Sequence, residues 1–201
     1  MSIYALKPKF QALLRPLVTR LAAAGVTANQ VTLAACLISL AVGAVVWWHA
    51  ANPVVFLLIP VWMLLRMALN AVDGMLAREF GQKSALGAYL NEITDVLSDA
   101  ALYFPFAFLP GSSMELIVLV IVLSAVSELA GIAAVLTGAS RRYDGPMGKS
   151  DRAFVFGLIG LLAGLGVPLP GWLNYAWMAL VVLIGITIRN RIRRGLAELQ
   201  R

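Results

Sequence analysis

A run of 20 residues without a formal charge, from Val31 to Ala50, is the feature that most constrains this chain. A helix that crosses the hydrocarbon core of a bilayer needs about 20 apolar residues. Five further apolar runs follow, and Pro and Gly separate them at 52–53, 110–111 and 168–171. Hydrophobic residues make up 61% of the chain and charged residues 13%, which excludes an ordinary soluble domain. The sequence therefore predicts an all-α integral membrane protein with six transmembrane helices.

We expect a single membrane domain over residues 1–201. Apolar residues recur at helical spacing in segment 1–25, with basic residues elsewhere on the helix. This pattern predicts an amphipathic helix that lies in the membrane interface, and a helix packed on the bundle is compatible with it. The six spans that follow are predicted at 31–50, 53–82, 84–110, 114–138, 152–167 and 172–190.

Lysine and arginine residues occupy alternate connections between these spans. They lie before the first span, in 78–83, in 139–152 and after the last span, whereas the connections near residues 51, 111 and 169 contain none. The positive-inside rule therefore predicts that both termini lie in the cytoplasm, and only Arg66 falls outside the pattern. The net charge of +6 belongs mainly to this face. Contact with anionic headgroups explains it, and we expect no nucleic-acid partner.

Ionisable residues inside the predicted spans gather at the end of the second span and the start of the third. One face of the second span carries Asn70, Asp73, Gly74, Ala77 and Arg78. The third span carries a stripe spaced by four residues, formed by Gly87, Asn91, Asp95 and Asp99. Two helices joined by a short connection pack antiparallel, so we expect the two stripes to face each other near the cytoplasmic surface.

The chemistry of these stripes is typical of a phosphate-handling metal site. Oxygen ligands suit a hard cation such as Mg²⁺ or Mn²⁺, and an arginine fork suits phosphate oxygens. Small residues beside the acids leave room for a ligand. The alternative to a metal site is a purely structural role, in which the Gly residues allow close helix packing and the Asn residues form hydrogen bonds between helices. That alternative does not explain three aspartates and an arginine at membrane depth, where charges are costly and usually functional.

These residues resemble the signature of the CDP-alcohol phosphotransferase (CDP-alcohol phosphatidyltransferase) family. The signature reads Asp-x2-Asp-Gly-x2-Ala-Arg-x8-Gly-x3-Asp-x3-Asp, and every spacing matches between Asn70 and Asp95. The first and third signature aspartates are replaced by Asn70 and Asn91. Segment 26–32 is similar to a Thr-Pro-Asn-x2-Thr stretch that often precedes the family's first span, with Ala28 in place of the proline.

The resemblance implies a reaction in which a substituted phosphate moves from a CDP-linked donor to an alcohol hydroxyl and CMP is released. It implies CDP-diacylglycerol as the donor and a small polar alcohol as the acceptor. It also implies a homodimer in the bacterial inner (cytoplasmic) membrane, with the active site on the cytoplasmic side. A catalytically impaired relative that binds a nucleotide or a lipid headgroup is one alternative. A small transporter that uses the acidic cluster as an ion site is another.

Carried over residue by residue, the resemblance assigns roles to the polar stripes. The metal, Mg²⁺ or Mn²⁺, is expected at Asn70, Asp73, Asn91 and Asp95, with Asp99 as a further candidate ligand. Asp95 is also the expected base that deprotonates the acceptor. The residues expected to bind CDP are Asn29, Asp73, Gly74, Ala77, Arg78 and Gly87. Because amides replace two carboxylates, we expect weaker metal binding or fewer ions than in a relative with four aspartates.

Two features outside the signature also carry predictions. The pattern Gly148-Lys149-x2-Arg152 resembles a basic motif in relatives, and it predicts that Lys149 and Arg152 bind a phosphate of the donor or acceptor. Cytoplasmic loops are basic in any case, so topology alone also explains these residues. Glu128 is a buried carboxyl in the fourth span, for which three roles stay open: a protonated acid, a partner of Arg66, or a lining residue of the acceptor pocket.

Overall fold

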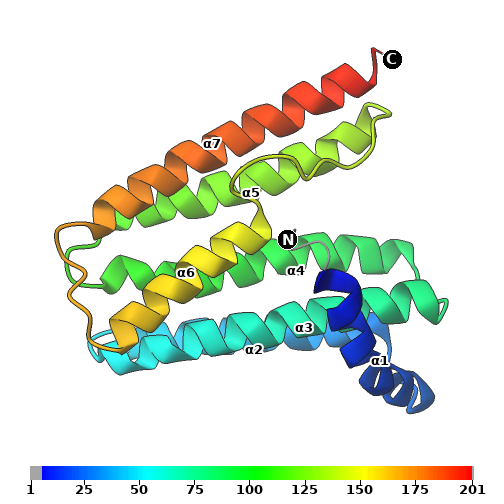
Figure 1. The fold of residues 1–201 in the computed structure, drawn as a ribbon, viewed down its shortest axis with the longest axis horizontal. Coiled ribbons are helices and arrows are strands. Elements are labelled where there is room, and N and C mark those ends of the chain that lie inside the picture. Colours follow the sequence, from blue (N-terminus) through cyan, green and yellow to red (C-terminus); the bar gives the residue numbers. More distant parts are fainter. Residues whose placement is uncertain (1–5, 201) are drawn as a thin grey trace.

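The computed structural model describes residues 6–200, and these residues form helices and connections without any strand (Figure 1). The all-α prediction is therefore confirmed for this part of the chain. The elements, in order, are α1 (Leu6–Ala23), α2 (Ala28–Trp48), the 3₁₀ helix η2 (Pro53–Leu57), α3 (Leu58–Glu79), α4 (Ala85–Tyr103), the 3₁₀ helix η3 (Phe104–Phe108), α5 (Met114–Leu136), α6 (Lys149–Gly164) and α7 (Leu173–Glu198).

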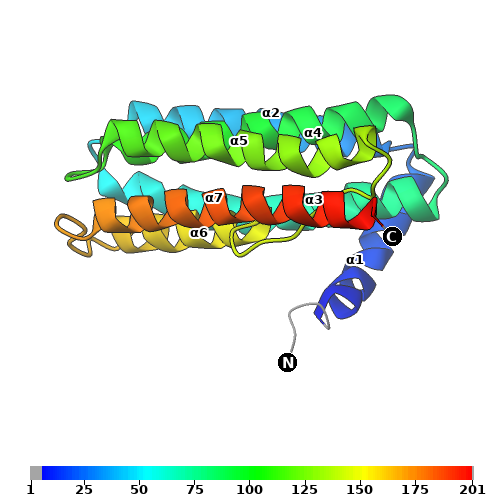
Figure 2. The same ribbon diagram turned by 90° about the horizontal axis from the view of Figure 1, so that it is seen from above.

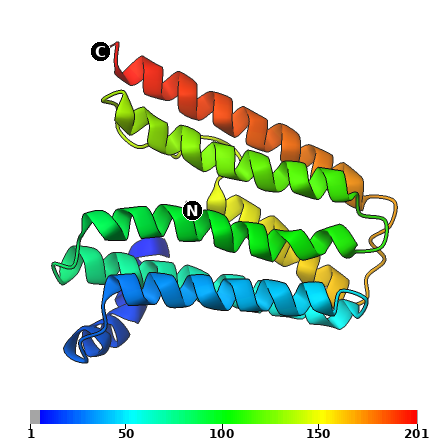
Figure 3. The same cartoon turned by 180° about the vertical axis from the view of Figure 1, so that it is seen from behind.

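Helices α2 to α7 form a bundle of two layers (Figure 2). One layer contains α2, α4 and α5, and the other contains α3, α6 and α7. The most extensive contacts join α5 to α7 and join α2 to both α3 and α4. Seen from behind, α5 and α7 run side by side as one pair (Figure 3). The backbones of α3 and α4 lie apart, because α2 packs against both helices. Their side chains nevertheless meet, since Arg66 of α3 pairs with Asp95 and Asp99 of α4.

Four segments of the described chain are long and apolar enough to cross a membrane: Ala28–Trp48, Pro53–Glu79, Met114–Leu136 and Leu173–Glu198. Helices α4 and α6 are not among them. Helix α4 contains Glu92, Asp95 and Asp99, and α6 has only 16 residues, which is short for a span of about 20. The bundle contains all six predicted helices, but the count of six crossings stays a prediction.

Several element boundaries differ from the predicted spans for identifiable reasons. The predicted spans 53–82 and 84–110 each contain a short 3₁₀ helix, with Pro53 and Pro105 in the first turn of η2 and η3. Helix α6 begins at Lys149 rather than 152 because the carboxylate of Asp151 accepts a hydrogen bond from the Gly148 N–H at 2.9 Å. Helix α7 continues to Glu198, whose carboxylate accepts a hydrogen bond from the Ser140 N–H at 2.9 Å.

Helix α1 packs on the bundle at the α3 side (Figure 2). Val18 is fully buried in a small apolar cluster with residues of α3, among them Val72 and Leu76. Leu13 and Leu17, on other parts of the helix, stay exposed. The packed arrangement that the sequence allowed is thus observed, and the interfacial position of segment 1–25 stays a prediction. The first five residues of that segment lie outside the described part of the chain.

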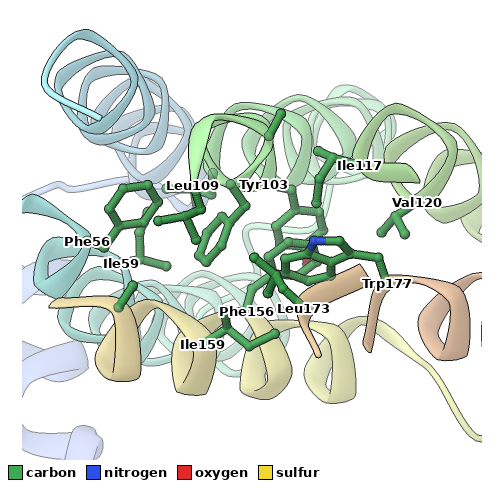
Figure 4. Packing of buried hydrophobic residues seen from close by; sticks show 14 of the residues in the cluster. Phe56, Ile59, Tyr103, Leu109, Ile117, Val120, Phe156, Ile159, Leu173 and Trp177 are labelled. Atoms are coloured by element: carbon green, nitrogen blue, oxygen red, sulfur yellow. The ribbon is translucent and has the colours of Figure 1, made fainter. Parts of the chain in front are cut away.

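An aromatic core holds the end of the bundle that lies away from the α3–α4 turn (Figure 4). The rings of Tyr103 and Phe156 stack with centroids 3.8 Å apart, and Phe156 stacks on Trp177 at 5.2 Å. Phe56 lies edge-on to Phe106 at 5.2 Å. These side chains come from η2, α4, η3, α6 and α7, so the core fixes one end of five elements and leaves the other end for polar residues.

A close approach of α2 to α4 generates the first prediction. A methyl group built at Gly43 would lie 2.4 Å from the carbonyl oxygen of Ala101, whereas one at Gly185 on α7 would meet nothing within 4 Å. We expect Gly43→Ala to lower the free energy of unfolding by about 1–3 kcal/mol, because overpacking forces the helices apart. Gly185→Ala is the matched control. Melting temperatures in detergent would measure both, and equal values would contradict the packing.

The second prediction concerns the number of crossings. If α4 and α6 both cross the membrane, the residues at their two ends must face opposite sides. Single cysteines at Phe80 and Tyr143 should then react only from the cytoplasm, and those at Pro110 and Pro170 only from outside. All four positions are exposed, and the native Cys36 is buried. Labelling of Phe80→Cys and Pro110→Cys from the same side would show that α4 does not cross.

Candidate active site

The signature residues of α3 and α4 lie on either side of the turn that joins the two helices at one end of the bundle (Figure 1). Ser84 caps α4, because its hydroxyl oxygen accepts a hydrogen bond from the Gly87 N–H at 2.9 Å. Gln82 joins the turn to the start of α2, since its side-chain oxygen accepts a hydrogen bond from the Ala28 N–H at 2.7 Å. The turn and the beginning of α2 are therefore held together, which brings segment 26–32 to the signature residues.

Two glycines of the signature make room for polar side chains. A methyl group at Gly87 would lie 2.7 Å from the side-chain oxygen of Asn29, and one at Gly74 would lie 2.8 Å from a guanidinium nitrogen of Arg78. Arg78 is exposed and Asn29 is partly buried. Four of the six expected CDP-binding residues thus form two close pairs, one between α2 and α4 and one within α3. Any side chain at either glycine would displace its polar neighbour.

Asp73 is the buried carboxylate of this group. The hydroxyl of Thr32, on α2, donates a hydrogen bond to Asp73 Oδ2 at 2.8 Å. Asp95 on α4 and Lys149 on α6 both lie near enough to act electrostatically on the Asp73 carboxylate. Asp73 and Asp95 therefore share one polar region although the backbones of α3 and α4 lie apart. Thr32 is the last threonine of the family-like stretch in segment 26–32, which was the available sequence signal for its role.

Asp95 is held on both of its oxygens. Arg66 Nη2, from α3, lies 3.1 Å from Asp95 Oδ1 and also donates to the Asp95 carbonyl oxygen at 3.2 Å. Asp95 Oδ2 forms an ion pair with the ammonium group of Lys149. The side chains of Asp95 and Lys149 are 19% and 30% exposed, whereas that of Arg66 is 5% exposed. Asp95 therefore lies at the open edge of the site. Its buried partner is Arg66, and its more exposed partner is Lys149.

A buried series of ion pairs continues from Asp95 into the bundle. Arg66 Nη1 donates to Asp99 Oδ1 at 2.6 Å, and Arg152 Nη2 lies 3.3 Å from Asp99 Oδ2. Arg152 Nη2 also lies 3.0 Å from one oxygen of Glu128, and Arg191 Nη1 lies 3.2 Å from the other. We call this series the ionic chain; its members are Asp95, Arg66, Asp99, Arg152, Glu128 and Arg191.

The ionic chain excludes one of the three roles that the sequence left open for Glu128, the partner of Arg66. Glu128 pairs with Arg152 and Arg191 and not with Arg66, which pairs with Asp95 and Asp99. Sequence reasoning missed Arg191, because it lies among other basic residues at the end of the last span. The signal for Arg66 was present, since it was the one basic residue that the topology did not explain.

The loop between α5 and α6 is anchored, and this anchoring places Lys149. Asp144 accepts hydrogen bonds from Arg142 Nε at 2.9 Å and from Arg194 Nη1 at 2.6 Å. Partial burial acts to raise the pKa of Asp144, but these two arginines outweigh it and hold the pKa below its usual range. The Met147 N–H donates to the hydroxyl of Thr187 at 2.9 Å. The loop is thus fixed along α7, and α6 begins at Lys149 beside Asp95.

The expected metal ligands offer only oxygen donors. Asp73 and Asp95 supply carboxylates, Asn70 and Asn91 supply amides, and both asparagines are partly buried. Within residues 6–200, no group of three or more His, Cys, Asp or Glu side chains is close enough to hold a metal ion. An all-oxygen set suits a hard dication, and the Lys149 ammonium group on Asp95 shows that this position favours a positive charge. The donor set therefore fits a single hard cation better than a pair.

The two expected phosphate-binding residues lie in different environments. Lys149 is at the open edge, where its ammonium group can reach a bound phosphate. Arg152 is fully buried, and its contacts are with Asp99, Glu128 and the Met147 carbonyl oxygen. Asp99, the further candidate ligand, is buried between two arginines. Ala77 is partly buried on the same helix as Gly74 and Arg78.

Comparison with known proteins gives a consistent result. A model of the CDP-alcohol phosphatidyltransferase family matches residues 25–188. The inner membrane protein YnbA of Escherichia coli K12 is 47% identical over 193 residues, which cover 96% of each chain.

Two crystal structures of Mycobacterium tuberculosis phosphatidylinositol phosphate synthase (PgsA1) share the fold. The one with manganese and citrate has a TM-score of 0.74 and 22% identity, over 90% of this chain and 88% of that one. The one with CDP-DAG bound has a TM-score of 0.73 and 21% identity, over 90% and 92%. The family model and the signature residues together lead to one assignment: the chain belongs to the CDP-alcohol phosphatidyltransferase family.

Proposed function

We propose that this protein transfers a phosphatidyl group from CDP-diacylglycerol to the hydroxyl of a small polar alcohol and releases CMP. The observation that carries the proposal is the convergence of the signature residues from α2, α3 and α4 on one end of the bundle. There, Asn29 lies against Gly87, Arg78 lies against Gly74, and Asp73 lies near Asp95. The M. tuberculosis synthase of similar fold was crystallised with CDP-DAG, which supports the choice of donor.

The donor binds with its acyl chains in the bilayer and its CDP group in the polar end of the bundle. We assign the CDP group to Asn29, Asp73, Gly74, Ala77, Arg78 and Gly87. Arg78 provides forked donors for diphosphate oxygens, and the glycines leave space for the nucleotide. The lack of basic residues at the opposite end supports a cytoplasmic site. The 47% identical E. coli protein is an inner membrane protein, which supports the same membrane here.

We assign a divalent metal, Mg²⁺ or Mn²⁺, to Asn70, Asp73, Asn91 and Asp95. The manganese in the structure of the M. tuberculosis synthase supports this assignment. When bound, the metal supplies positive charge that neutralises the diphosphate and favours departure of CMP. Lys149, whose ammonium group lies beside Asp95 and whose side chain is 30% exposed, would contact a phosphate oxygen of the bound donor.

Asp95 is the residue that takes the proton of the acceptor hydroxyl. Its Oδ1 is fixed by Arg66, so the proton passes to Oδ2, the oxygen that faces the open edge and Lys149. Arg66 acts as a positioning residue, because it sets the orientation of the carboxylate without contacting the substrate. A correctly oriented carboxylate within reach of the hydroxyl is the requirement for general base catalysis.

The third prediction tests the base directly. Asp95→Asn keeps the shape of the side chain and removes its charge, so we expect CMP release from CDP-diacylglycerol to fall by about 10²–10⁴-fold. The matched control is Glu115→Gln, which likewise replaces a carboxylate by an amide, at an exposed position in the first turn of α5. Turnover should also stop when a chelator removes Mg²⁺ and Mn²⁺. Full activity of Asp95→Asn would refute the role, and an inactive wild type that still binds CDP would favour the catalytically impaired alternative.

The fourth prediction tests the nucleotide pocket. Gly87→Ala places a methyl group on the Asn29 side chain, so we expect the KM for CDP-diacylglycerol to rise by about tenfold with a smaller effect on kcat. Gly157→Ala is the control, because a methyl group there would have its nearest neighbours at 3.8–3.9 Å, an ordinary contact distance. Steady-state kinetics with varied donor would separate the two parameters. An unchanged KM in Gly87→Ala would remove Asn29 and Gly87 from the pocket.

A further inference from the structure

Three arginines converge on the carboxylate of Glu128. Arg152 Nη2 lies 3.0 Å from it, Arg191 Nη1 lies 3.2 Å from it, and Arg141 Nη2 lies 4.0 Å from it. They come from α6, from α7 and from the α5–α6 loop, and Glu128 comes from α5. We call Arg141, Arg152 and Arg191 the arginine cluster. Forked guanidinium groups that converge from several elements form an arrangement that binds phosphate in proteins.

In this protein, carboxylates of the chain itself already occupy the position that a phosphate would take at the arginine cluster. The side chains of Arg152 and Arg191 are only 1% and 2% exposed, so each needs a buried negative partner. Glu128 serves both, Asp99 serves Arg152 as well, and Glu92 accepts a hydrogen bond from Arg141 at 2.9 Å. A phosphate group on these arginines would be forced close to the same carboxylates.

The small space around the cluster also excludes a phosphate group. Asp99, Glu128 and Arg152 line a cavity of about 10 Å³ between α4, α5 and α6. That volume holds about one water molecule and has no room for a phosphate group. Each of the three arginines keeps a buried Nε–H without a partner among the described residues. A neutral oxygen can accept a hydrogen bond from such a group without bringing a negative charge next to Glu128.

The cluster is connected to the proposed base. Arg152 joins Glu128 to Asp99, and Arg66 joins Asp99 to Asp95. Arg141 in the cluster and Lys149 in the site are both partly exposed, at 28% and 30%. The ionic chain leads without a break from the proposed base to the arginine cluster.

We infer that Glu128 is a specificity-determining residue and that the acceptor is an alcohol without a phosphate group. Glu128 occupies the arginine cluster and so repels a phosphorylated acceptor, while hydroxyl groups of a neutral acceptor remain compatible with it. This inference rests on the proposed transferase function, because it names the substrate class of that same site.

The first test compares matched acceptors with the wild-type protein. CMP release from CDP-diacylglycerol is measured with glycerol against glycerol 3-phosphate, and with inositol against inositol 1-phosphate. We expect kcat/KM to be at least about tenfold higher for the member without phosphate in the better pair. A preference for the phosphorylated member would overturn the inference. This test needs no variant, so it does not depend on the folding of a substituted protein.

The second test does not require turnover. Binding of glycerol 3-phosphate is measured by calorimetry to the wild type, to Glu128→Gln and to Glu115→Gln, an exposed residue of the same helix. We expect Glu128→Gln to bind at least about tenfold more tightly than the other two, because the arginines have lost their built-in anion. Equal binding by all three would overturn the inference. Absence of CMP release with every acceptor would refute the proposed function instead, and the binding comparison would still decide the role of Glu128.

Discussion

The arrangement of the bundle depends on buried charges that must each have a partner. An unpaired charge in the interior of a membrane protein costs several kcal/mol, and removing one partner of a buried pair costs about as much. In the ionic chain, Arg66 links α3 to α4, Arg152 links α6 to α4 and α5, and Arg191 links α7 to α5. A shift of any one helix would leave a charge unpaired. Arg66 therefore holds α3 and α4 in register across the site, although the backbones of the two helices do not pack closely.

The need to pair buried charges also explains why helix α4 is less apolar than the four candidate spans. The aromatic core contains no charged side chain and holds one end of the bundle, whereas the ion pairs lie nearer the other end. Helix α4 lacks the apolar character of the four candidate spans because it carries Glu92, Asp95 and Asp99, and α6, with 16 residues, is too short. The charged side chains of α4 pair with residues of α3, of the α5–α6 loop and of α6, and those of α6 pair with residues of α4 and α5.

The sequence predicted the helical elements and the residues of the site better than it predicted their partners. Spacing alone identified the two polar stripes, from Asn70 to Arg78 and from Gly87 to Asp99, because a face of a helix is a local property. Pairing is not local: Arg66 and Asp99 meet through the packing of separate helices, and Arg191 becomes buried only because α7 continues beyond its predicted end. The position of α2 against both α3 and α4 was not predictable for the same reason, since it depends on packing between separate helices.

Asn70 and Asn91 give the site fewer charges than four aspartates would, and Lys149 and Arg66 balance the carboxylate of Asp95. The central claim is that this cluster nevertheless forms the active centre. The most direct measurement is a crystal structure with Mn²⁺ and CDP, with the metal located by its anomalous scattering. The account predicts a manganese peak in contact with Asp73 and Asp95, and the cytidine beside Asn29 and Gly87. No peak at these aspartates, or CDP bound elsewhere on the protein, would contradict it.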